Sequence, residues 1–168
     1  MSSLTAFGSA PTGYPPTAPP ATKASIRSAL ALALKSDAGV TAAVGSNVFP
    51  LIVPESASFP ALTYQIVQTA RERGLGGPTG IADAKVQFTA HSRNLAECDA
   101  AIEAVRQVLD GLGGATFDDG TSLISILGCT LDDERDTANP PTDGSDRGVL
   151  MSSIDYTIRY REPRPRGL

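Results

Sequence analysis

The segment from Phe59 to Leu112 constrains the fold most, because it runs through a strand pattern, a glycine-rich stretch, a second strand pattern and a helix pattern. Residues 61–67 alternate as a half-buried strand requires, with three apolar side chains on one face. These are Leu62, Tyr64 and Ile66. Residues 86–90 restore the alternation and predict a second strand. This order of elements carries no catalytic signature and favours assembly over chemistry.

From Asn94 onward the apolar residues recur at spacings of three and four, which predicts an amphipathic helix with one buried stripe. The stripe consists of Leu95, Cys98, Ile102, Val105, Leu109 and Leu112. Asn94 is placed to act as the N-cap, and Glu97 to complete a capping pair with it. The sequence therefore predicts one long helix directly after the second strand.

Residues 70–80 separate the two strands and are predicted to form a mobile hairpin loop, because four glycines make ordering costly. The glycine spacing does not match a dinucleotide-binding loop, and a strand rather than a helix follows, so phosphate binding is not favoured. The loop also contains Arg71, Arg73 and Leu75, which we regard as candidate residues for binding another protein.

Before this region, a first helix is predicted to end at Ser36, with Thr22 or Ser25 as its N-cap. Its apolar stripe is formed by Ile26, Ala29, Leu30, Ala33 and Leu34. A short turn of helix over 40–44 and a short edge strand over 47–51 are predicted to follow.

After the long helix, residues 117–121 predict a tight turn and 122–131 a strand. Simple alternation along this strand separates Ile124, Ile126 and Gly128 from a second set of residues on the other face. That second set is Leu123, Ser125, Leu127 and Cys129. Residues 132–146 read as a long polar loop, and 149–161 as the closing strand.

The closing strand alternates cleanly, so one face of the sheet should be packed while the other is wet or meets a partner. The packed residues are Ile154, Tyr156, Ile158 and Tyr160. Together the patterns predict an α+β fold, with one mainly antiparallel sheet and two helices on its apolar face. Residues 22–168 are expected to form this single domain, and residues 1–21 an extended proline-rich N-terminal arm.

The net charge of -4 and the pI near 4.9 argue against a protein that holds nucleic acid by neutralising phosphates. No apolar run approaches the roughly 18 residues of a membrane span, and no signal-peptide pattern opens the chain. A soluble protein made in a cytoplasm is expected.

Catalytic, cofactor and metal sites are not predicted. His91 is the only histidine, and no nucleophile-elbow motif accompanies it. Cys98 and Cys129 are unclustered and are expected to be reduced core residues. The acidic residues of 132–146 do not have the spacing of an EF-hand loop, so a solvated or partner-facing loop is expected there.

The two ends of the folded region carry opposite charges, which could meet head to tail in a ring of subunits. The acidic loop contains Glu134 and Arg135, while the C-terminus contains Arg161 and Arg164. Together with Tyr14 in the N-terminal arm, these residues complete the set of candidate protein-interface residues. A frayed basic tail is the alternative for the C-terminus.

The order of these features resembles the tail completion, or tail terminator, proteins of long-tailed bacteriophages and gene transfer agents. The resemblance covers most of the chain after the N-terminal arm. It rests on Ile26 to Leu34, Asp37-Ala38-Gly39-Val40, Val44-Gly45, Val48-Phe49-Pro50, Phe59-Pro60-Ala61-Leu62-Thr63-Tyr64, Gly76-Gly77, Ala84 to Ala90, Leu95 to Leu112, Glu134-Arg135 and the final strand to Tyr160. The N-terminal arm departs from the shorter family pattern.

The resemblance implies a structural virion protein without catalytic residues, assembled in the bacterial host cytoplasm. Its subunits would form a ring, as a homohexamer, at the head-tail junction. The ring would contact the tail tube protein and a head-side stopper or connector protein, and DNA would pass through the lumen without specific binding. The alternatives are another neck protein, such as a stopper or adaptor, a small cytoplasmic binding module, or a small enzyme that uses His91.

Overall fold

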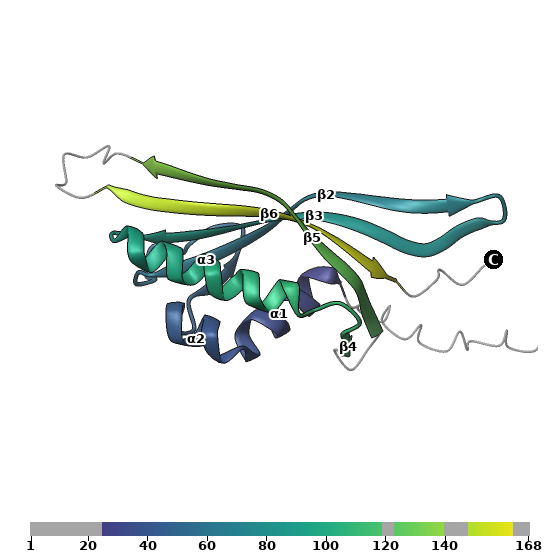
Figure 1. The fold of residues 1–168 in the computed structure, drawn as a ribbon, viewed down its shortest axis with the longest axis horizontal. Helices are drawn as coiled ribbons and strands as arrows, with labels where there is room; N and C mark the ends of the chain where they lie inside the picture. Colours follow the sequence, from purple (N-terminus) through teal and green to yellow (C-terminus); the bar gives the residue numbers. More distant parts are fainter. Residues whose placement is uncertain (1–24, 119–122, 140–147, 163–168) are drawn as a thin grey trace, which may run out of the picture.

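The computed structural model describes residues 25–118, 123–139 and 148–162. These form one six-stranded sheet in the order β1-β2-β3-β6-β5-β4, with all three helices of the described residues on one side (Figure 1). The helices are α1 (Ile26–Ser36), α2 (Ala38–Val44) and α3 (Leu95–Asp110). The strands are β1 (Val48–Pro50), β2 (Ala61–Gly74), β3 (Gly77–Ser92), β4 (Thr116–Asp118), β5 (Leu123–Asn139) and β6 (Val149–Arg161).

The predicted α+β fold with one mainly antiparallel sheet is confirmed. Every neighbouring pair of strands is antiparallel except β1 and β2, which are parallel. The short strand β1 lies at the edge of the sheet, as predicted. The segment predicted as a turn of helix is α2, so the structure has one helix more than the two expected. None of the helices in the described residues has the length and apolarity needed to span a membrane.

The helix starts follow from side-chain caps. Ser25 Oγ accepts from the Ser28 N–H at 3.2 Å, and Asn94 Oδ1 accepts from the Ala96 N–H at 3.1 Å. The predicted capping pair of Asn94 with Glu97 does not form. Ser92, the last residue of β3, accepts from the Asn94 N–H at 3.2 Å and donates to the Glu97 carboxylate. The serine therefore takes the N–H that the glutamate would have bonded.

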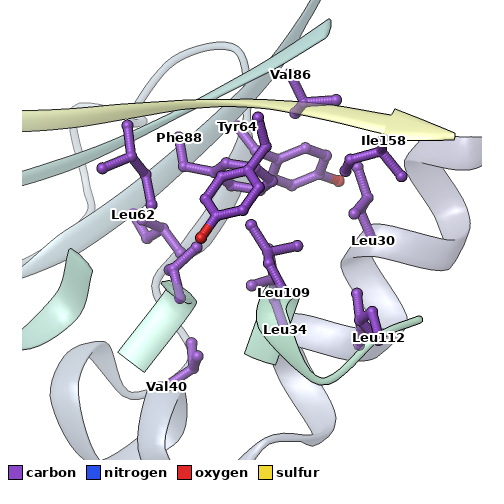
Figure 2. Close-up of a cluster of buried hydrophobic side chains, with 14 of the residues drawn as sticks. Leu30, Leu34, Val40, Leu62, Tyr64, Val86, Phe88, Leu109, Leu112 and Ile158 are labelled. Atoms are coloured by element: carbon purple, nitrogen blue, oxygen red, sulfur yellow. The ribbon is translucent and has the colours of Figure 1, made fainter. Parts of the chain in front are cut away.

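The core lies between the helices and the covered face of β2, β3, β6 and β5, and Figure 2 shows its centre. The rings of Phe88 and Tyr156 meet edge to face with their centroids 6.4 Å apart. The α3 stripe is buried as predicted except for Leu95, which is 47% exposed because it lies in the first turn at the margin of the stripe. Leu112 comes after the end of the helix but is still buried.

The prediction of a loop over 70–80 was wrong, because β2 continues to Gly74 and β3 begins at Gly77. Only Leu75 and Gly76 form the turn between them. Gly77 and Gly80 have φ angles of 111° and 80°, which glycine adopts without strain. We call residues 68–81 the distal hairpin. It extends beyond the helices (Figure 1), so neither face is buried and the strand alternation is lost.

The predicted polar loop over 132–146 was also wrong for its first part, because β5 continues to Asn139. These residues pair with β6, from Asp133 opposite Asp155 to Asn139 opposite Val149. Residues 140–147 lie outside the described part. A register shift between Ile126 and Gly128 also turns Cys129 to the helix side, opposite the buried Ile158, rather than to the face predicted from simple alternation.

Candidate protein-interaction surfaces

The face of the sheet opposite the helices, which we call the open face, is polar. Along β3 the alternating residues Ala84, Val86 and Phe88 are fully buried against the helices. The residues between them point the other way, because successive side chains of a strand alternate. Alternation and cross-strand pairing place Thr63, Asp83, Lys85, Gln87, Thr89, His91, Ser153, Asp155, Thr157 and Arg159 on the open face.

The cations in the central part of the open face are matched by carboxylates, whereas Arg161 at the end of β6 forms no ion pair within the described residues. Arg159 contacts Glu72 at 3.1 Å and Asp83 at 3.6 Å. Lys85 contacts Asp132 at 3.8 Å, and the same carboxylate accepts a hydrogen bond from Thr157 Oγ1 at 2.6 Å. With Arg135 and its two acidic partners included, these contacts hold five carboxylates and three cations. The open face therefore offers little unpaired positive charge to a phosphate backbone.

Arg135 holds the most buried of these carboxylates. Its guanidinium lies 3.2 Å from Asp155 and 2.9 Å from Asp133. The Asp155 side chain is only 11% exposed, whereas Arg135 is 45% exposed. Removing water from a carboxylate is costly unless a cation compensates. Arg135 therefore stabilises the sheet at this position by compensating the charge of Asp155.

A shallow hollow of about 300 Å³ lies on the open face beside Arg135. Its floor is a hydroxyl network in which Thr63 Oγ1 lies 2.9 Å from His91 Nε2, and Thr89 Oγ1 lies 2.9 Å from Ser153 Oγ. Burial lowers the pKa of His91, so its imidazole is neutral at pH 7. His91 therefore has the environment of a structural histidine, with a neutral ring that is hydrogen-bonded to a threonine.

Cys98 does not meet His91. The cysteine lies on the helix side of the sheet, with Sγ 3.5 Å from the Leu150 carbonyl oxygen. Burial raises the pKa of the Cys98 thiol, which keeps it protonated and a weak nucleophile. Within the part of the chain that the structure describes, no group of three His, Cys, Asp or Glu residues could hold a metal ion.

The distal hairpin is tied to the end of β6 by polar contacts instead of apolar packing. Arg71 forms two hydrogen bonds with the Glu162 carboxylate, at 3.0 and 3.1 Å, and Tyr160 donates to the same group at 3.0 Å. The hydrogen bonding of Arg71 to the Glu162 carboxylate, and then the negative charge of that carboxylate, raise the pKa of Arg71. At the tip, Leu75 is fully exposed. The hairpin thus presents an uncovered apolar side chain on a polar support.

Comparison with known proteins assigns this chain to a family. The sequence matches the family of tail completion protein gp17 over residues 28–149, which is more than half of the chain. The chain belongs to the tail completion protein gp17 family. Membership in this family makes it a structural protein of phage-type tails, as the resemblance implied.

The solved structures add a fold match. A chain of the virion of a native gene transfer agent particle is similar with a TM-score of 0.54 and 20% sequence identity. The match covers 79% of this chain and 90% of that chain. At this identity the match shows a shared fold. The search of the curated proteins finds no match.

In this member of the family, the predicted interface residues fall into two groups at opposite ends of the sheet. Arg71, Arg73 and Leu75 lie on the distal hairpin, and Arg161 ends β6 next to it. The second group, Glu134 and Arg135, lies on the far part of β5, on opposite faces of the sheet. The structure does not bring the two groups together within one subunit. Tyr14 and Arg164 lie outside the described residues.

Sequence reasoning missed the open-face carboxylates and cations of β3, which are Asp83 and Lys85. A signal was present, because the alternation that predicted Val86 and Phe88 as buried also assigns their neighbours to the other face. The partner of Lys85 could not be found in this way. Asp132 reaches it only because β5 continues as a strand beyond the bulge.

Proposed function

We propose that this chain is the subunit of a tail terminator ring, which caps the tail tube and joins it to the head-side connector. Six copies would form the ring, as the resemblance implies, and DNA would pass through its lumen. Family membership supports a tail structural role. The fold shared with a chain of a gene transfer agent virion supports a place in such a particle.

The observation that favours this function most is the chemistry of the open face. It spans the four long strands, no helix in the described residues covers it, and its central cations Lys85, Arg135 and Arg159 are already paired with carboxylates. A lumen through which DNA slides must be wet and must not hold phosphates, since affinity rises with the number of phosphates neutralised. A net charge of -4 for the whole chain agrees with this requirement.

The proposal is tested by deleting the gene in a particle-producing host and complementing it with tagged protein. Without the chain, heads and tails should accumulate separately, and the tagged chain should co-purify with the tail tube protein. Light scattering and negative-stain microscopy of the purified protein should show rings. Co-purification with the head connector alone would instead indicate a stopper or adaptor, and a monomer that joins no particle would overturn the proposal.

A matched pair of variants tests the lumen assignment. Lys85→Ala and Asp83→Lys change two neighbouring residues of the open face. The first makes the face more negative and the second makes it more positive. If the open face lines the lumen, Asp83→Lys should slow DNA passage while Lys85→Ala leaves particle yield near the wild-type value. Equal yields of DNA-filled particles from both variants would contradict the assignment. Both proteins should be checked for normal folding by circular dichroism.

A further inference from the structure

The charged side chains of the four long strands are sorted by whether they have an ion-pair partner. Most form an ion pair within the described residues of the subunit. The charged residues on β2, β3, β5 and β6 that form no such ion pair are Arg73, Arg161, Glu134 and Asp136. All four are exposed. The two cations and the two anions are thus available for contacts outside the subunit.

The available charges also lie at opposite ends of the sheet. Arg73 is opposite Pro78 in the distal hairpin, and Arg161 is opposite Ile81 at its base. Glu134 is opposite Ile154, toward the other end of β6, and Asp136 is two pairs further along, opposite Ser152. Figure 1 shows the two ends of the sheet projecting in opposite directions. The subunit has one cationic end and one anionic end, and no single subunit can bring them together.

These charges are accompanied by free strand edges at the two margins of the sheet. In the described part of the chain, β1 pairs with β2 only as far as Tyr64, and β4 pairs with β5 only as far as Ser125. The outer edges of β2 from Gln65 and of β5 from Leu127 have no neighbouring strand there. Long open edges are sites of association unless they are covered. Each margin therefore combines an open edge with unmatched charge of one sign.

We propose that the distal hairpin of one copy docks against the acidic part of β5, residues 132–138, in a second copy. Arg73 would face Glu134 and Asp136 across this contact, and Leu75 at the tip would supply apolar contact area. The contact is heterologous, because the two surfaces come from different places on the subunit, and a heterologous contact builds a ring when the rotation between neighbouring subunits closes. The inference rests on the proposed ring and names the surfaces that hold it together.

Charge complementarity makes a second copy the occupant. The chain itself carries both halves of the contact, with Arg73 available at one end and two carboxylates at the other. Like charges would meet if the subunits associated with the same ends together, which disfavours a symmetric dimer through either end. A different acidic protein that bound the hairpin would leave the available carboxylates of β5 without a role.

The test reverses charges on each side of the contact separately and then together. The variants are Arg73→Glu, the double variant Glu134→Arg with Asp136→Arg, and the triple combination. The control is Lys35→Glu, which makes the same change of charge as Arg73→Glu at an exposed position of α1. Self-association is measured by analytical ultracentrifugation across a concentration series. Each one-sided variant should raise the concentration needed for half-maximal assembly about tenfold or more, and the control should not.

The triple combination should restore assembly to within about threefold of wild type, because the opposite charges face each other again. Salt should weaken the wild-type and restored contacts alike, since exposed charges are screened over about 8 Å at 0.15 M ionic strength. Rings that form normally in every one-sided variant would overturn this contact but leave the proposed function standing. A wild-type chain that stays monomeric at all concentrations and in particles would overturn both.

Discussion

Leu109 and Leu95 of α3 provide a direct test of how the helix is packed. Sequence periodicity assigns both to one apolar stripe, but Leu109 is 1% exposed and Leu95 is 47% exposed. Leu109 packs among the side chains of the core centre (Figure 2). Leu109→Ala removes buried atoms and leaves a cavity, which costs about 2–5 kcal/mol in buried leucines. Leu95→Ala should cost less than about 1 kcal/mol, because half of the side chain already contacts water.

The free energy of unfolding of both variants is measured by urea denaturation followed by far-UV circular dichroism. Measurements at several protein concentrations separate subunit stability from self-association. With a typical total of about 5–15 kcal/mol, the loss at Leu109 should be a substantial fraction of the stability. Equal losses at the two positions would show that α3 is rotated or displaced relative to this structure, and would refute the packing argument.

Three further predictions concern the ion pairs of the sheet, the half-buried thiol of Cys129 and the histidine of the open face. Arg135→Ala should lower the free energy of unfolding by about 1–3 kcal/mol, because it leaves the nearly buried Asp155 carboxylate without that cation, whereas Arg71→Ala at an exposed pair should cost less than about 1 kcal/mol. Burial, with a smaller contribution from a nearby aspartate, raises the pKa of the Cys129 thiol from 9.0 to about 11. In a variant that lacks the other cysteine, alkylation of Cys129 at pH 8 should therefore be about 100-fold slower in the folded than in the unfolded protein. Similar rates in the two states would contradict the burial of this thiol. His91→Ala should leave assembly intact, and a folded variant that fails to assemble would assign the histidine a function.

The parts of the fold that could be predicted from sequence are the elements buried on one side only, because one-sided burial makes apolar residues recur with the period of the helix or strand. Tyr156 and Ile158 flank Thr157 in the sequence of β6, share one face of the strand and are fully buried, as alternation predicts. The N-cap Asn94 forms as predicted, and Ser25 is one of the two N-caps predicted for the first helix, because capping depends on residues within one turn. Local chemistry and one-sided burial are both visible in a single sequence.

The parts that could not be predicted depend on a neighbouring strand. Residues 132–139 are acidic and lack alternation, but β6 supplies their backbone hydrogen-bond partners and holds them as a strand. The side of the sheet on which Cys129 lies depends on the register shift before Gly128, and the residue pattern does not predict that shift. The charged candidate interface residues were chosen from their charge and their position in the sequence. Their grouping at two ends of one sheet required the strand order.

The same physical property explains why the distal hairpin was predicted as a loop and why it suits a partner. No helix covers it, so its residues need not alternate, and its polar ties to β6 leave Leu75 exposed at the tip. Leu75→Asp should therefore leave the free energy of unfolding of the isolated subunit within about 0.5 kcal/mol of wild type, as is usual for surface substitutions. It should weaken self-association, because a carboxylate would enter a contact already lined by Glu134 and Asp136. Urea denaturation and ultracentrifugation of the same sample distinguish the two effects. A large loss of subunit stability would mean that the tip packs within its own subunit, and unchanged assembly would remove Leu75 from the contact.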